Sequence, residues 1–200
     1  MRLAWLVLAL AACTASPAPV SLSETWPSQA GDFEDVNQDW TRRATLRGEY
    51  QQALEVFATF RSPAWRAARA AHEIRMRNLH GGAAEAVHAA ARTAAEGDYE
   101  VALVVTTYER SENDLHRGDR SVWRVALVDD AGVETPPMKI VRDRRPPDIL
   151  RADFPMIGDF ATVYIATFPR TAAVLRAGAR RVALRMWSVR GAVELVWAAP

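Results

Sequence analysis

Three segments of this 200-residue chain have the composition of β-strands, and they constrain the fold more than any other feature. They are Val56–Arg61 (VFATFR), Val104–Glu109 (VVTTYE) and Tyr164–Pro169 (YIATFP). Each is a β-branched or aromatic run that reaches Thr followed by an aromatic residue, a composition typical of strands in half-buried sheets. Because their spacing is unequal, they do not form a fixed-period repeat. We therefore expect a sheet built from these three strands.

Further strands are predicted in the second half of the chain. Residues Ser121–Val128 alternate between apolar and polar types, and Met138–Val141 is a short apolar run. Near the C-terminus, Val182–Val189 and Ala192–Trp197 flank Arg190–Gly191, a two-residue loop with glycine second. Such loops connect the strands of β-hairpins. The chain is expected to end in a hairpin with one buried face.

A helical region is predicted between the first two of the three similar strands. Ser62 and Pro63 are the residue types preferred at a helix start, and an apolar stripe at helical spacing follows: Trp65, Ala68, His72, Met76 and Leu79. Gly81 and Gly82 interrupt this helix. A second, alanine-rich helix is expected over Ala83–Glu96, ended by Gly97.

The order of these elements predicts an α+β fold, an antiparallel β-sandwich-like domain with a helical hairpin (about 63–96) inserted between early strands. Residues 40–200 are expected to form this single domain, and the pattern leaves open whether 40–60 are strand or helix. An alternative is a tetratricopeptide-like solenoid, because Gly48–Leu54 and Gly97–Leu103 resemble each other. Their offset is longer than the repeat of about 34 residues that such proteins use.

The charge balance and the single cysteine restrict which partners the chain can bind and how its fold can be stabilised. Arg2 is the one charged residue in 1–12, so the rest of the chain carries 24 basic and 24 acidic residues. A balanced charge disfavours nucleic-acid binding. Cys13 is the only cysteine, so no intrachain disulfide is possible and stability must come from packing.

The first residues, MRLAWLVLALAACTAS, contain a short apolar run that stops before the cysteine. The run is shorter than the roughly 20 apolar residues that span a bilayer. Leu10-Ala11-Ala12-Cys13 resembles the lipobox of bacterial lipoproteins. The resemblance implies a signal peptide at 1–12, an acylated Cys13 that binds the membrane, and a place in the cell envelope. An ordinary secretory signal is the alternative.

Residues 13–39 are expected to be a flexible tether after the acylated cysteine. They contain Pro17, Pro19 and Pro27 and show no sustained period, so a free chain of this length would span about 25–30 Å. By the same resemblance, Thr14 after the cysteine favours the outer membrane.

Two polar segments contain candidate ligand-binding residues. The loop Glu109–Arg120 carries four carboxylates that could bind Ca²⁺, namely Glu109, Glu112, Asp114 and Asp119. Three arginines in the same loop favour a salt-bridged surface instead. A second group could bind a phosphate, a carboxylate or a partner, namely Arg142, Arg144 and Arg145.

The histidines give weaker signals for a site. His72 falls on the apolar helix stripe, where a core or boundary role is expected. Glu85 and His88 are three residues apart, the step used in carboxylate-bridged metal centres, but the chain has a single copy. No catalytic residue, metal or cofactor is predicted.

The sequence thus predicts an envelope lipoprotein whose soluble domain is a non-catalytic binding or assembly module for another protein or an envelope polymer. The alternative is an envelope hydrolase or metal-dependent enzyme that uses the 109–120 loop or the 72–88 helical region.

Overall fold

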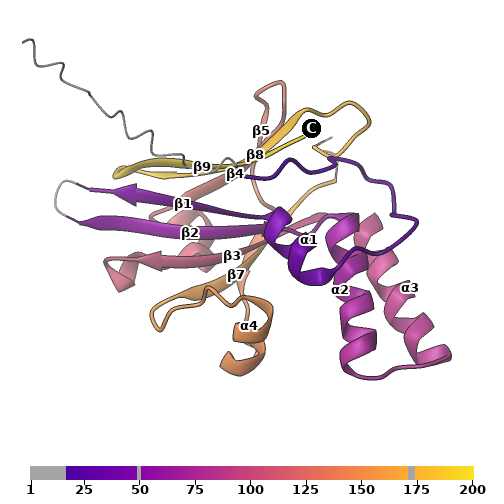
Figure 1. Ribbon diagram of the computed structural model, residues 1–200. Coiled ribbons are helices and arrows are strands. Elements are labelled where there is room, and N and C mark those ends of the chain that lie inside the picture. The colour runs from indigo at the N-terminus through magenta and orange to yellow at the C-terminus, as the bar shows by residue number, and fades with distance from the viewer. Residues whose placement is uncertain (1–16, 49–50, 171–173) are drawn as a thin grey trace, which may run out of the picture.

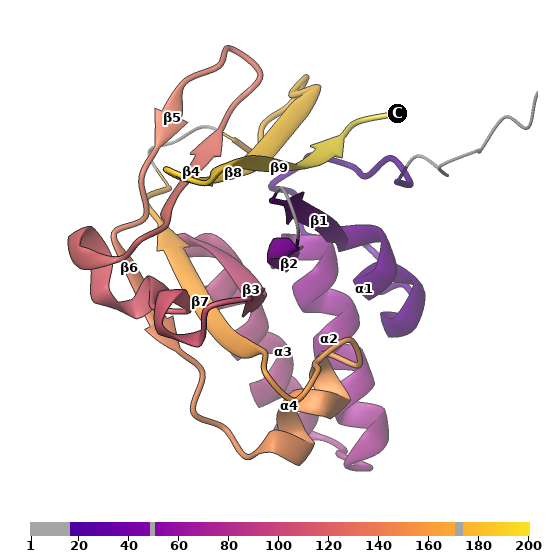
Figure 2. The same cartoon turned by 90° about the vertical axis from the view of Figure 1, so that its left-hand side faces the viewer.

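The computed structural model describes residues 17–48, 51–170 and 174–200. Two antiparallel sheets pack face to face, and the α-helices lie to the side of one of them (Figures 1 and 2). The fold is therefore α+β with sandwich-like sheets, which confirms the predicted fold class. The predicted signal peptide and Cys13 lie outside the described residues.

Sheet A has five strands in the order β1-β2-β3-β7-β6, and sheet B has four in the order β5-β4-β8-β9. All neighbouring strands are antiparallel. The bounds are β1 Thr41–Arg47, β2 Gln52–Phe60, β3 Tyr99–Thr107, β4 Arg124–Val128, β5 Glu134–Thr135, β6 Lys139–Arg142, β7 Thr162–Phe168, β8 Arg181–Ser188 and β9 Gly191–Ala198.

The helices are short and have local start signals. Ser62 Oγ accepts a hydrogen bond from Trp65 N at 3.2 Å, as expected for an N-cap before Pro63. The bounds are α1 Phe33–Trp40, α2 Pro63–Met76, α3 Gly82–Glu96 and α4 Pro147–Asp153, with 3-10 turns at Arg110–Glu112 and Leu115–Arg120. Helices α2 and α3 form the predicted hairpin between β2 and β3.

The three similar segments become β2, β3 and β7, which are neighbours in sheet A. Residues 40–60, which the pattern left open, contain the β1–β2 hairpin. The tetratricopeptide-like alternative is wrong. The second of the two similar segments, Gly97–Leu103, runs into the central strand β3 and not into a helix.

The C-terminal hairpin is confirmed, but its turn is one residue earlier than predicted. Ser188 pairs with Gly191, so Val189 and Arg190 form the turn. Gly191 has φ of 132°, a conformation that favours glycine. Leu46 also lies 3.1 Å from the place where a Cβ on Gly191 would stand, so the glycine allows β1 to approach the hairpin.

The core lies between the two sheets and is rich in aromatic residues. Phe60 packs against Trp40 and Trp197, with ring centroids 5.9 and 5.6 Å apart. All three side chains are buried, and Trp197 Nε1 donates to the carbonyl oxygen of Trp40 at 2.9 Å. This contact joins the last strand to the start of the domain.

The structure corrects the expectation of a flexible tether over residues 13–39. In the described part of that segment, Val20 N donates to Ala198 O at 2.8 Å, and Leu22 O accepts from Arg176 N at 3.1 Å. Val20, Leu22 and Phe33 are buried, and Phe33 begins α1. The segment docks because its few apolar residues fill gaps beside β9 and α2, a gain that periodicity does not show.

Arg42 fixes this docked segment to both sheets. Its guanidinium is buried, with 4% of the residue exposed, and it donates to the carbonyl oxygens of Ala18, Asp39, Thr41 and Val196 at 2.6–3.1 Å. Burial lowers the pKa of Arg42, and the charge of Asp39 opposes that effect. One side chain therefore connects the N-terminal segment, the end of α1, β1 and β9.

We expect Arg42→Met to lower the free energy of unfolding by about 2–3 kcal/mol, because it leaves buried carbonyl groups without a donor. Amide exchange at Val20 should also become faster. The matched control is Arg43→Met, since the neighbouring side chain is 63% exposed and should change stability by less than about 1 kcal/mol. Equal effects of the two variants in urea unfolding and hydrogen exchange would contradict this role.

Candidate functional site

An open cleft of about 600 Å³ lies between α1, the β1–β2 hairpin, α2 and the residues around the end of α4. Its volume is in the range of small-molecule and peptide side-chain sites. The larger apolar residues that line it are Phe33, Phe57, Pro155 and Met156. The polar residues at its walls are Glu34, Asn37, Gln38, Thr41, Arg42, Arg43 and His72.

The α1 wall is held in place by contacts with α2. Asp32 caps α1 by accepting a hydrogen bond from Glu34 N at 2.9 Å. The ring of Phe33 packs on His72 and Trp65, with centroid distances of 4.9 and 5.9 Å. Trp65 also donates through Nε1 to Asn37 at 2.8 Å. These contacts on successive turns give α1 one orientation.

The β1–β2 wall presents a stacked cation above an aromatic ring. The Arg43 guanidinium carbon lies 5.4 Å from the centroid of Phe57, and Arg43 Nε donates to Glu55 at 2.9 Å. Phe57 faces away from the core between the sheets, since its neighbours Val56 and Ala58 are buried there. This wall offers an apolar surface and a guanidinium that is paired with Glu55.

The α4 wall is anchored on the outer face of sheet A. Phe154 is buried against a small apolar cluster with Ala102, Val104 and Val163. Met156 packs at the edge of this cluster and also lines the cleft. The cleft floor is thus continuous with a second, smaller core.

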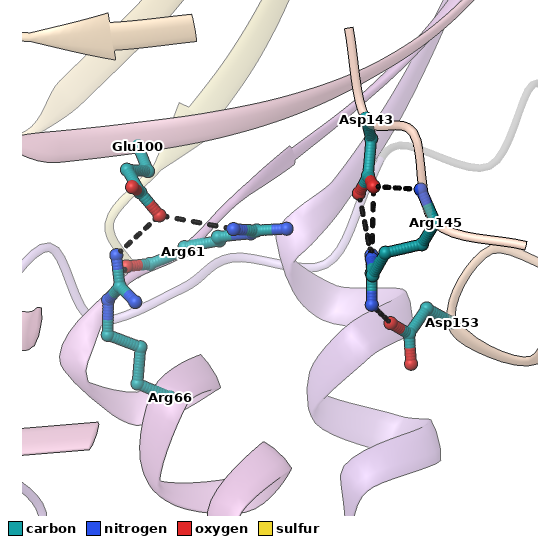
Figure 3. Close-up of polar contacts among 6 residues, drawn as sticks. All are labelled: Arg61, Arg66, Glu100, Asp143, Arg145 and Asp153. Carbon is teal, nitrogen blue, oxygen red and sulfur yellow. Dashed lines mark hydrogen bonds and ion pairs between the residues drawn. The ribbon is translucent and has the colours of Figure 1, made fainter. Parts of the chain in front are cut away.

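An arginine–carboxylate network fastens α4 to α2 and to the segment between β6 and α4. Asp153 pairs with Arg69 at 2.8 Å and also with Arg145, which pairs with Asp143 at 2.7 Å. Figure 3 shows Arg145 between the two aspartates. Its hydrogen bond to Asp143 is the main cause of a raised Arg145 pKa, so this guanidinium remains charged.

A second pair of arginines meets one carboxylate at the start of α2. Glu100 on β3 accepts from Arg61 at 3.1 Å and from Arg66 at 3.0 Å (Figure 3). Burial alone would raise the pKa of Glu100, but the charges of Arg61 and Arg66 hold it below its ordinary value. In the same way, burial opposes ionisation of Asp143, yet hydrogen bonds from Arg145 lower its pKa.

The predicted group Arg142, Arg144 and Arg145 does not converge on one point. Arg145 is occupied by Asp143 and Asp153, whereas Arg142 on β6 donates to Asn113 O at 3.3 Å. Arg144 lies between them on the exposed surface. The three therefore do not form one anion-binding fork in the described residues.

The carboxylates of the 109–120 loop also have separate environments. Asp114 is buried and accepts from Ser121 Oγ at 2.7 Å and Val122 N at 3.2 Å. Glu112 pairs with Arg190, while Glu109 and Asp119 are exposed. Within residues 17–48, 51–170 and 174–200, no three His, Cys, Asp or Glu residues are placed to hold a metal ion.

The histidine candidates lie on two different surfaces. His72 is half-buried and lines the cleft, which gives it a boundary position. Glu85 and His88 share a face of α3 with Arg92, beside Trp26. The Arg92 guanidinium lies 5.3 Å from the Trp26 ring.

Sequence reasoning did not identify Phe33, Phe57 or Met156 as residues of one site. The available signal was Asp32-Phe33-Glu34, an N-cap followed by an acidic first turn, which predicts the start of α1. No comparable sequence signal predicts that α1 and α4 lie close together, because they are more than a hundred residues apart in the chain.

Comparisons with known proteins do not assign this chain to a family. No family model, curated sequence or solved structure matches this chain. The part of the chain that the structure describes also has no helix long and apolar enough to cross a membrane.

Acidification should weaken the arginine–carboxylate network. Because the folded pKa values of Glu100 and Asp143 are lowered, their stabilisation is complete above the unfolded values, about 4. It is lost as the pH falls from about 5 through the folded values. Glu100→Gln should lower stability at pH 7 and flatten this decline in urea unfolding. The control Glu85→Gln, on the exposed face of α3, should keep the wild-type profile; an unchanged profile in Glu100→Gln would contradict the assignment.

Proposed function

We propose that this protein is an envelope lipoprotein whose domain binds another protein or an envelope polymer through the cleft between α1, β1–β2, α2 and α4. The cleft is the observation that carries the proposal. It combines an apolar floor with polar groups along its walls, a composition that suits recognition of another molecule. Its walls come from four separate elements that packing and ion pairs hold in place.

The shape of the cleft favours an occupant with an apolar group and polar neighbours. Phe33, Phe57 and Met156 offer apolar contact, whereas Gln38 and His72 offer hydrogen-bonding groups at the walls. The Arg43 guanidinium, stacked on Phe57 and paired with Glu55, adds hydrogen-bond donors. A peptide side chain with its backbone, or a substituted sugar polymer, has this mixture of groups.

The lipoprotein part of the proposal rests on Leu10-Ala11-Ala12-Cys13 and on the single cysteine. Two or more acyl chains on Cys13 would anchor the chain stably, since each buried methylene contributes about 0.8 kcal/mol. By the lipobox resemblance, the outer membrane is the proposed destination.

Lipid attachment is tested by expressing the full chain in a two-membraned bacterium supplied with an alkyne-labelled fatty acid. We expect the label and membrane association with the natural sequence and neither with Cys13→Ser. A matched control, Cys13→Ser with Ser16→Cys, restores a thiol three residues away and should also remain unlabelled. Release of an unlabelled, processed natural chain would instead favour an ordinary secretory signal.

Binding in the cleft is tested with a photo-cross-linking amino acid at Gln38, which lines it. We expect one dominant adduct in living cells. Ala152→Trp should abolish this adduct, because Ala152 is exposed and lines the cleft, so that an indole there would fill it.

The control for this experiment is Ala86→Trp, which places the same side chain on the exposed face of α3, away from the cleft. It should leave the adduct unchanged. Absence of any adduct, or an adduct that Ala152→Trp does not reduce, would contradict binding in the cleft.

A further inference from the structure

The docked N-terminal segment leaves very little free chain between Cys13 and the folded domain. Arg42 donates to Ala18 O at 2.7 Å, and Val20 joins β9 through Ala198. Ala18 is five positions after Cys13, and a chain of that length reaches at most about 18 Å. An acyl group on Cys13 would therefore hold the domain next to the bilayer rather than at the end of a long tether.

The surfaces nearest to residue 18 are the outer face of sheet B and the side that carries α1. Figure 2 shows the N-terminal segment running beside β9, with the outer face of sheet B above it and the α-helices below. In the described residues, no helix covers the outer face of sheet B in either view (Figures 1 and 2). Alternation places Ala126, Val128 and Ala183 on this face, where they are buried. A short tether brings both surfaces within reach of the bilayer.

The two surfaces differ in charge. Helix α1 and its cap carry four acidic charges, from Asp32, Glu34, Asp35 and Asp39, of which Asp32 is paired with Arg75 at 3.8 Å. On β8, Val182, Leu184 and Met186 are in the core, so alternation places Arg181 and Arg185 on the outer face of sheet B. Anionic lipid headgroups would repel the acidic α1 and attract the arginines on the outer face of sheet B.

The outer face of sheet B has a small excess of positive charge and one aromatic anchor. Arg181 pairs with Glu194 at 2.7 Å and Arg185 with Glu134 at 2.6 Å. Arg124 donates to two backbone carbonyl oxygens and pairs with no carboxylate in the described residues. Opposite Arg124 in the ladder lies Trp187, half-buried beneath the Arg185 guanidinium at 5.5 Å.

Tryptophan and arginine are the residue types that favour the bilayer–water interface. We infer that the outer face of sheet B lies on anionic phospholipid headgroups of the membrane that holds the anchor. This inference rests on the proposed function, because it requires the acylated Cys13. The attraction of one excess charge is small, so the tether must supply a high local concentration.

The test uses residues 13–200 with the single thiol coupled to a maleimide lipid in vesicles that contain about one third phosphatidylglycerol. Lipids brominated near the headgroup quench nearby tryptophans. We expect quenching of the wild-type emission and its loss in Trp187→Phe. The matched control is Trp26→Phe, because Trp26 is also half-buried but lies against α3, and it should retain the quenching.

Two further measurements use the folded wild-type protein and so do not depend on a variant. Replacing phosphatidylglycerol with a neutral lipid should reduce the quenching, and uncoupled protein should show none. Absence of quenching in the coupled wild type, quenching unchanged in Trp187→Phe, or quenching lost in Trp26→Phe would overturn the inference. Because maleimide coupling replaces acylation, this result is independent of whether cells modify Cys13.

Discussion

The arrangement of the two sheets depends on the buried guanidinium of Arg42. Its donors point in several directions in one plane, so they can satisfy carbonyl groups from segments that no regular ladder joins. Here they connect Ala18, Asp39 and Val196, which brings the first residues of the domain, the end of α1 and the last strand to one point. A lysine could not reproduce this geometry, because its ammonium is a single point of charge.

Local patterns predicted most of the regular elements and the fold class. The segments around Thr59, Thr107 and Thr167 were recognisable because a strand's residue preferences act over a few positions. Ser62 and Gly97 marked the ends of the helical hairpin for the same reason. The docking of residues 17–32 was not predictable in this way. A single Leu22 between two serines has no periodicity, and the group that orders its carbonyl, Arg176 N, is 154 residues away.

The cleft was harder to predict than the fold, since its residues share no local motif. Phe33, Phe57 and Met156 become neighbours only when α1 and α4 pack on the same side of sheet A. Sequence also could not show what Arg145 would bind. Asp143 and Asp153 pair with it and compete with any external anion, so Arg145 became part of the framework that holds α4.

The contacts that the N-terminal segment and β1 make with β9 affect when the domain can complete its folding. Val20 and Arg42 need Ala198 and Val196 as partners, and Val196 lies 154 residues after Arg42 in the chain. Contacts of such long sequence separation form late in folding. The docking of the N-terminal segment is therefore expected to be a late step of folding, after the two sheets that it joins have formed.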